Sequence, residues 1–224
     1  MDEYANIRCC VMYSSGCNGI LSNEEIQKNR CMSKQNDIVV TIGRQVGSGG
    51  RIVGEKLAQR LGVPFYDKRI LERAAKESGI KGEFFERLDE NFSPFRQIIS
   101  SAMSDVSMFQ EQSATIFKAA TEGGAVFVGR CSDYILREHK NIVNVFLTAD
   151  MPDRIARAMQ YFKISEQEAV KLIREREKAR SKYYSFFTDK TWGASESYHL
   201  SMNTSLIGLD ACVDLIMSYI NNRK

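Results

Sequence analysis

The sequence lacks the features that mark several large classes of protein. No run approaches the roughly 18 consecutive apolar residues that a membrane span needs. The first residues include Asp2 and Glu3 and form no apolar core of the signal-peptide type. A formal net charge of +3 is too small to indicate a nucleic-acid-binding protein, although it suits anionic substrates if the cations gather at one site. We therefore expect neither membrane insertion, secretion nor nucleic-acid binding.

Cysteines with metal-ligand spacing are also lacking. The six cysteines follow no such pattern, and Cys9 and Cys10 are adjacent, so we expect reduced thiols and a cytoplasmic protein. Four of the six lie in residues 1–36, which show no hydrophobic periodicity. We predict that residues 1–36 are a tail outside the core, either disordered or upstream residues that a start at Met32 would omit. A functional cysteine arm is the alternative.

From residue 37 onward, short apolar runs alternate with helical patterns. The helical spacing of apolar residues is clear over 52–61, and Asp67 is suited to cap a further helix. Strands alternating with helices predict a parallel sheet with helices on both faces, and 224 residues suffice for one substantial α/β core. Four runs are predicted to be strands: residues 38–42, 63–66, 125–128 and 142–147.

A glycine-rich turn, RQVGSGGR, joins the first predicted strand to the first predicted helix. Gly47, Gly49 and Gly50 surround Ser48, and glycines allow successive backbone N–H groups to converge on one anion. The positive end of the following helix dipole points to the same place. The turn is therefore predicted to bind phosphate, although a turn that only joins strand to helix is the alternative.

A strongly cationic helix is predicted near the C-terminus. Ser165 and Glu168 form a capping-box pattern, and the apolar positions of this helix stop at Ile173. The segment that follows is either a solvated charged helix or a lid whose cations close over phosphates during transfer. Its five cations are Arg174, Arg176, Lys178, Arg180 and Lys182.

Five short motifs occur in one order along residues 37–220: GSGGR, FYDK, VGRCSDYIL, KARSKYY and NTS. In this order they resemble the cytidylate-kinase-like family of P-loop nucleoside monophosphate kinases. The resemblance implies a P-loop NTPase-type parallel sheet flanked by helices, with helical monophosphate-binding and lid insertions. It also implies that residues 37–224 form one kinase domain with a lid at about residues 163–195.

The activity implied by the resemblance is ATP-dependent phosphoryl transfer to a nucleoside monophosphate, CMP or dCMP. ATP and Mg²⁺ would be required, the partners would be small-molecule nucleotides, and the chain would be a monomer or a homodimer. The alternative is a catalytically impaired nucleotide-binding regulatory module with the same fold. Three departures from the family pattern favour this alternative, because Gly50, Ile52 and Val128 stand where the family has lysine, threonine and an acidic residue.

Site residues follow from the turn and from the resemblance together. The residues expected to hold ATP are Arg44, Gly47, Ser48, Gly49, Gly50 and Arg51. The residues expected to act in transfer are Arg51, Lys178, Arg180 and Arg174. The residues expected to hold the acceptor are Asp67, Arg130 and Asp133.

Other roles are open for several of these residues. Arg130 could instead pair with Asp133, and Asp67 could serve only as a helix cap. No metal ligand is assigned, although either carboxylate could assist magnesium. Nearby aromatic residues are expected to pack within the lid and its hinge: Tyr183, Tyr184, Phe186, Phe187 and Trp192.

Overall fold

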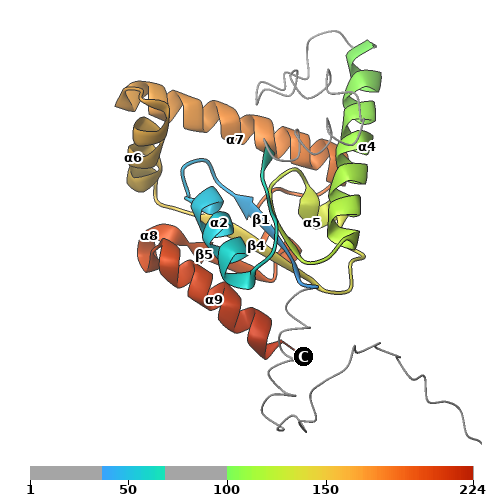
Figure 1. The fold of residues 1–224 in the computed structure, drawn as a ribbon. Coiled ribbons are helices and arrows are strands. Elements are labelled where there is room, and N and C mark those ends of the chain that lie inside the picture. Colours follow the sequence, from blue (N-terminus) through green and yellow to red (C-terminus); the bar gives the residue numbers. More distant parts are fainter. Residues whose placement is uncertain (1–36, 69–99, 224) are drawn as a thin grey trace, which may run out of the picture.

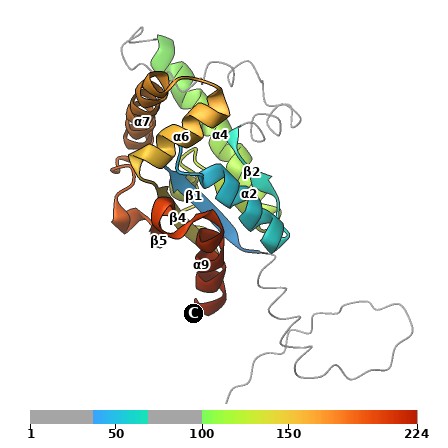
Figure 2. The ribbon, with the colours of Figure 1, turned by 90° about the vertical axis from the view of Figure 1, so that its left-hand side faces the viewer.

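The computed structural model describes residues 37–68 and 100–223 (Figures 1 and 2). The predictions made for residues 1–36 lie outside this part of the chain. So does all but the first residue of the helix expected to follow Asp67.

Five parallel strands form the sheet, in the order β2-β3-β1-β4-β5. The predicted parallel sheet and its four predicted strands are thereby confirmed. The short edge strand β5 was not predicted, because its four residues, LSMN, are too few to establish a pattern and form no apolar run, and none of them is fully buried. The strands are β1 (Val39–Arg44), β2 (Phe65–Tyr66), β3 (Ala125–Val128), β4 (Ile142–Thr148) and β5 (Leu200–Asn203).

Helices cover both faces of the sheet and one of its ends (Figure 1). The longest, α7, starts with the predicted capping box, in which Ser165 and Glu168 each bond the other's backbone N–H. The helices of the described residues are α2 (Gly50–Leu61), α4 (Ser100–Thr121), α5 (Ser132–Ile135), α6 (Met151–Phe162), α7 (Glu166–Thr188), α8 (Thr204–Ile207), α9 (Leu209–Asn222) and the 3₁₀ turn η2 (Ser195–Ser197).

Alternate residues of the central strand β1 enter two different cores. Val40 and Ile42 pack with α2 and α9 on one face. Val39 packs with Phe127 of β3 and Ile116 of α4 on the other face. All five side chains are at most 1% exposed, so β1 is buried on both faces and is held at the centre of the domain.

A third, smaller core lies at the end of the sheet where α6 and α7 meet (Figure 2). Val46, from the turn after β1, packs there with Ala158 of α6 and with Ala169 and Ile173 of α7. The glycine-rich turn is therefore packed against the cationic helix. No helix within residues 37–68 and 100–223 has the length and apolarity needed to cross a bilayer. In the same part of the chain, Cys131 and Cys212 are buried free thiols.

Candidate active site

The glycine-rich turn adopts a backbone conformation that favours glycine at two positions. Gly47 and Gly49 have φ values of 78° and 80°, in the left-handed region that favours glycine. Gly49 is the N-cap of α2, so the helix starts immediately after the turn, as predicted. The turn thus places the positive end of α2 beside the end of β1.

The carbonyl groups of the turn are held from outside by side chains of distant segments. Nε of Arg154 donates to the carbonyl oxygen of Val46 at 2.8 Å, and Nη1 of Arg157 donates to that of Gly47 at 3.0 Å. The buried hydroxyl of Thr204 donates to the carbonyl oxygen of Ser48 at 2.9 Å. The carbonyls are therefore bound on the outside of the turn, on the side of α6 and α8.

The backbone N–H groups of the turn are arranged differently. Within residues 37–68 and 100–223, the N–H groups of Gly47 and Gly49 donate to no backbone carbonyl, whereas that of Ser48 donates to Gln45 at 3.3 Å. The N–H groups of Gly47 and Gly49, on either side of Ser48, are thus donors without a backbone acceptor in the described part of the chain, and N–H groups of this kind in a tight turn can bind an anion. The turn can therefore donate hydrogen bonds to a phosphate.

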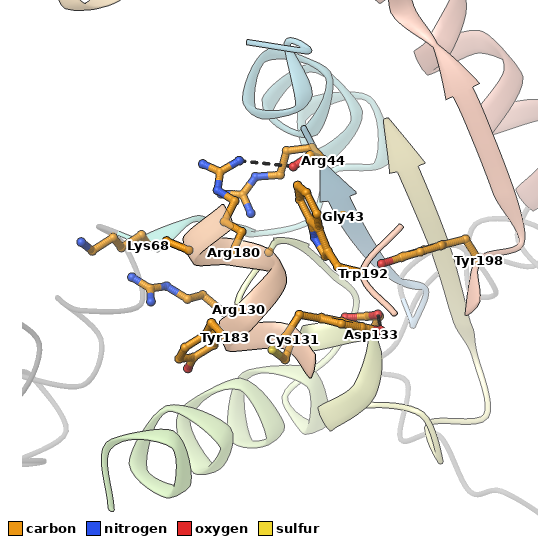
Figure 3. A pocket seen from close by; sticks show the side chains of 13 residues that line it. Gly43, Arg44, Lys68, Arg130, Cys131, Asp133, Arg180, Tyr183, Trp192 and Tyr198 are labelled. Atoms are coloured by element: carbon orange, nitrogen blue, oxygen red, sulfur yellow. Dashed lines mark hydrogen bonds between the residues drawn. The ribbon is translucent and has the colours of Figure 1, made fainter. Parts of the chain in front are cut away.

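One cavity lies where the first three strands of the chain end, a position at which parallel sheets bind ligands (Figure 3). Four cations from four segments point into it: Arg44 from the end of β1, Lys68 after β2, Arg130 after β3 and Arg180 from α7. The guanidinium of Arg180 also donates to the carbonyl oxygen of Arg44 at 3.2 Å. Cations gathered in this way suit a ligand with several negative charges.

Strained backbone shapes the wall of this cavity after β3. Gly129, Arg130 and Cys131 have φ values of 77°, 62° and 55°, and a left-handed conformation costs a non-glycine residue about 1–2 kcal/mol. The side chain of Gln112, which is almost completely buried, supports the turn by donating to the carbonyl oxygen of Arg130 at 3.1 Å. Such strain is concentrated at functional sites and fixes where Arg130 points.

Asp133 is the acidic residue of the cavity wall. Its carboxylate accepts a hydrogen bond of 2.7 Å from the hydroxyl of Tyr184. Burial raises the pKa of Asp133, while the bond from Tyr184 and the charge of Lys190 oppose the rise. Asp133, which the sequence also offers as an ion-pair partner for Arg130, is thus hydrogen-bonded to Tyr184. Through this bond Tyr184 attaches α7 to the segment between β3 and α5.

Comparison with known sequences and structures is consistent with this geometry. The sequence pattern of the cytidylate kinase-like family matches residues 39–206. This chain belongs to the cytidylate kinase-like family. A cytidylate kinase of Ignicoccus hospitalis is 26% identical over 183 residues, which span 80% of this chain and 96% of that protein.

Solved structures share the fold of this chain. The crystal structure of an uncharacterized protein from Eubacterium ventriosum has 27% identity and a TM-score of 0.68, and it matches over 83% of this chain and 99% of its own. Shikimate kinase from Bacteroides thetaiotaomicron has 14% identity and a TM-score of 0.50, and it matches over 82% of this chain and 98% of its own. The second likeness concerns the fold alone, which is the predicted P-loop kinase type.

Several of the residues predicted from the family pattern come together, and others lie apart. Arg44, Arg130, Asp133 and Arg180 line the one cavity. Gly47, Ser48, Gly49 and Gly50 form the adjacent turn and the start of α2. Lys178 and Arg174 are exposed on α7 and are not among the residues that line this cavity. Their predicted part in transfer stays a prediction.

Arg51, in the first turn of α2, belongs to an ion-pair cluster. Its guanidinium is 3.0 Å from a carboxylate oxygen of Glu55 and 3.0 Å from one of Asp67. Asp67 is buried at the end of β2, so the pair joins α2 to that strand. Two predicted site residues are therefore bound to each other, and their roles toward ATP and the acceptor stay predictions.

Magnesium would come to this family's site with ATP. Within residues 37–68 and 100–223, no group of three histidine, cysteine or acidic side chains is placed to hold a metal ion. Magnesium that arrives with a nucleotide is commonly held by phosphate oxygens and water, with only one or two protein carboxylates. A site of that kind needs no cluster of three protein ligands. Of the two carboxylates considered for magnesium, Asp133 lines the cavity and is hydrogen-bonded to Tyr184, whereas Asp67 follows β2 and would have to share its oxygens with Arg51.

The position of α7 depends on a second ion pair, between Arg154 of α6 and Glu177 of α7. Their nearest nitrogen and oxygen atoms are 2.5 Å apart, and the side chains are only 5% and 23% exposed. Since Arg154 also binds the carbonyl of Val46, it joins the glycine-rich turn to α7. Neither partner was singled out from the sequence, because the contacts of Arg154 are visible only once residues far apart in the chain have met.

Replacing Glu177 with alanine should lower the free energy of unfolding by about 2–3 kcal/mol, because the nearly buried guanidinium of Arg154 loses its counter-charge. The matched control is Glu175→Ala. Glu175 is 64% exposed, and its carboxylate is as far as 4.0 Å from the amine of Lys171, so this ion pair is weak. That change should cost at most about 0.5 kcal/mol. Urea unfolding of both variants tests the prediction, which equal losses would contradict.

Proposed function

We propose that this protein transfers the γ-phosphoryl group of ATP to a nucleoside monophosphate. Its membership of the cytidylate kinase-like family supports kinase chemistry. The single observation that carries the proposal is the convergence of Arg44, Lys68, Arg130 and Arg180 on one cavity beside the glycine turn. Phosphoryl transfer between two nucleotides needs cations around several phosphates at once, whereas simple binding of one phosphate does not.

The proposed roles follow the positions of the residues. The N–H groups of the turn and the start of α2 would hold the phosphates of ATP. Arg130, fixed by its strained turn, would hold the monophosphate of the acceptor, because a guanidinium can bind phosphate through two hydrogen bonds. Arg180, which bridges from α7 to the carbonyl of Arg44, would stabilise the charge of the group in transfer. Closure of α7 would exclude water.

CMP or dCMP is the acceptor that we propose. The support is the name of the Ignicoccus hospitalis relative, a cytidylate kinase, together with the length over which the two proteins match. Asp133 and the aromatic wall formed by Tyr183, Tyr184 and Trp192 provide a polar and planar surface of the kind that a base could meet.

A specific observation favours a second candidate, a nucleotide-binding regulatory module. α2 begins with Gly50 and continues with the exposed Ile52, where a phosphate loop of the usual composition has a lysine and a hydroxyl-bearing residue. Such a module would bind ATP without transferring its phosphoryl group.

The two candidates are separated by an assay of ADP release with ATP and Mg²⁺, run with each common nucleoside monophosphate in turn. The kinase proposal predicts acceptor-dependent release, with CMP or dCMP giving the highest kcat/KM. If ATP binds but no acceptor stimulates release, the regulatory module takes the place of the kinase.

A further inference from the structure

The side chain of Arg44 occupies space that two glycines leave open. A Cβ atom built on Gly50 would lie 2.7 Å from both Cβ and Cγ of Arg44, and one built on Gly129 would lie 1.8 Å from its Nη1. Both distances are too short for real contacts. Arg44 therefore runs from the end of β1 past the first residue of α2 and over the turn after β3, and its guanidinium lies beside that of Arg180 (Figure 3).

Gly50 holds the place at which a phosphate loop normally carries its lysine, immediately after the last glycine of the turn and at the start of the helix. That lysine reaches the β- and γ-phosphates. Gly50 does not have a positive φ, so its backbone would accept a side chain. What would prevent a side chain at this position is the stem of Arg44.

The neighbouring cation, Arg51, is differently placed. Its guanidinium contacts two carboxylates, those of Glu55 and Asp67, both at 3.0 Å. Arg51 does not line the cavity that holds the other cations, whereas Arg44 does. Position relative to the cavity thus distinguishes the two arginines that flank the turn.

We propose that Arg44 is the phosphate-binding cation of this protein, taking over from the end of β1 the work of the lysine missing at position 50. Gly50 and Arg44 then form a compensating pair, in which the small residue makes room for the relocated charge. The inference rests on the proposed function for its ligand, which is the triphosphate of ATP.

The test is a charge swap measured by calorimetric titration with a non-hydrolysable ATP analogue and Mg²⁺. Arg44→Met keeps an aliphatic stem over Gly50 and removes the charge, so the Kd should rise about thirtyfold, as for loss of a charge-assisted hydrogen bond. Gly50→Lys alone should also raise the Kd, because the lysine meets the stem of Arg44. Combining Gly50→Lys with Arg44→Gly removes both the Cβ and the Cγ atoms that the lysine would meet, and should return the Kd to within about threefold of the wild type.

Two further variants calibrate the measurement. Arg51→Ala tests the rival arginine and should raise the Kd less than Arg44→Met does, because its guanidinium is already paired with Glu55 and Asp67. Arg137→Ala, which removes an exposed charge that does not line the cavity, controls for net charge. Thermal melting of each variant shows whether it is folded. If Arg44→Met is not folded, Arg44→Lys replaces it. The Kd of Arg44→Lys should rise at least about fivefold, because lysine lacks the planar fork of the guanidinium.

An unchanged Kd in Arg44→Met, a larger effect of Arg51→Ala than of Arg44→Met, or a double variant no better than Gly50→Lys would each overturn the inference. Because the readout is binding, the outcome is independent of turnover. If the swap behaves as expected but no acceptor is phosphorylated, the phosphate cation is correctly assigned and the kinase proposal alone fails. If turnover exists and Arg44→Met binds the analogue normally, the kinase proposal stands and the assignment of Arg44 as the phosphate cation fails.

Discussion

Replacing Arg180 with alanine should lower kcat by about a hundredfold while the Kd for ATP changes by less than about threefold. The guanidinium comes from α7, lies in the cavity with Arg44 and donates to the carbonyl oxygen of that residue at 3.2 Å. A cation in this position contributes most when negative charge develops on the group in transfer. Single-turnover kinetics and calorimetric titration of the same variant separate the two effects.

The control for Arg180→Ala is Lys171→Ala, which removes a positive charge from the same helix at a side chain that is 76% exposed. This change should leave both kcat and the Kd close to the wild-type values. A normal kcat in Arg180→Ala would remove this residue from transfer, and the two exposed cations Lys178 and Arg174 would then be the next to test.

The second large effect is expected from Gly47→Ala, which should raise the Kd for ATP by about a hundredfold. A Cβ atom at this position would lie 2.5 Å from the carbonyl oxygen of Arg154, and φ is +78°. The left-handed conformation alone costs about 1–2 kcal/mol, and the contact with rigid backbone adds to it, so the turn must move. A shift of the turn also breaks the bond from Arg157 to the Gly47 carbonyl.

Gly62→Ala provides a matched control for Gly47→Ala. Gly62 ends α2 with φ +67°, and a Cβ atom there would meet nothing within 4 Å. The two variants share the cost of a left-handed alanine, but only Gly47→Ala has a clash, and that clash lies at the glycine-rich turn. Comparable ATP affinity in the two variants would show that Gly47 only joins β1 to α2 and takes no part in binding ATP. Melting curves would report the conformational cost that the two variants share.

The strands and the cationic helix were predictable because burial imposes their sequence patterns. The predicted bounds of β3 match the structure, since both faces of this strand are buried and the run AVFV ends where burial ends. β1 extends two residues beyond the predicted run because Gly43 and Arg44 pair with Phe146 and Leu147 of β4. No local apolar pattern reports that pairing.

The cations of the site were predictable only where a motif contained them. Arg44, Arg130 and Arg180 stand in or beside such motifs. Lys68 belongs to the motif FYDK as well, but it was assigned to the helix expected after Asp67 and was not singled out. Arg157 could not be found in this way, since it is 110 residues from the carbonyl that it binds. The direction of Arg51 was equally hidden, because it depends on where the end of β2 places Asp67.

The central claim is that this member of the cytidylate kinase-like family moves a phosphoryl group between nucleotides. Its most direct test is to incubate the full chain with γ-labelled ATP, Mg²⁺ and CMP and to separate the products. The proposed function predicts label in CDP and one ADP formed for each CDP. Formation of no labelled nucleoside diphosphate from CMP or from any other common monophosphate, under conditions in which ATP binds, would contradict it.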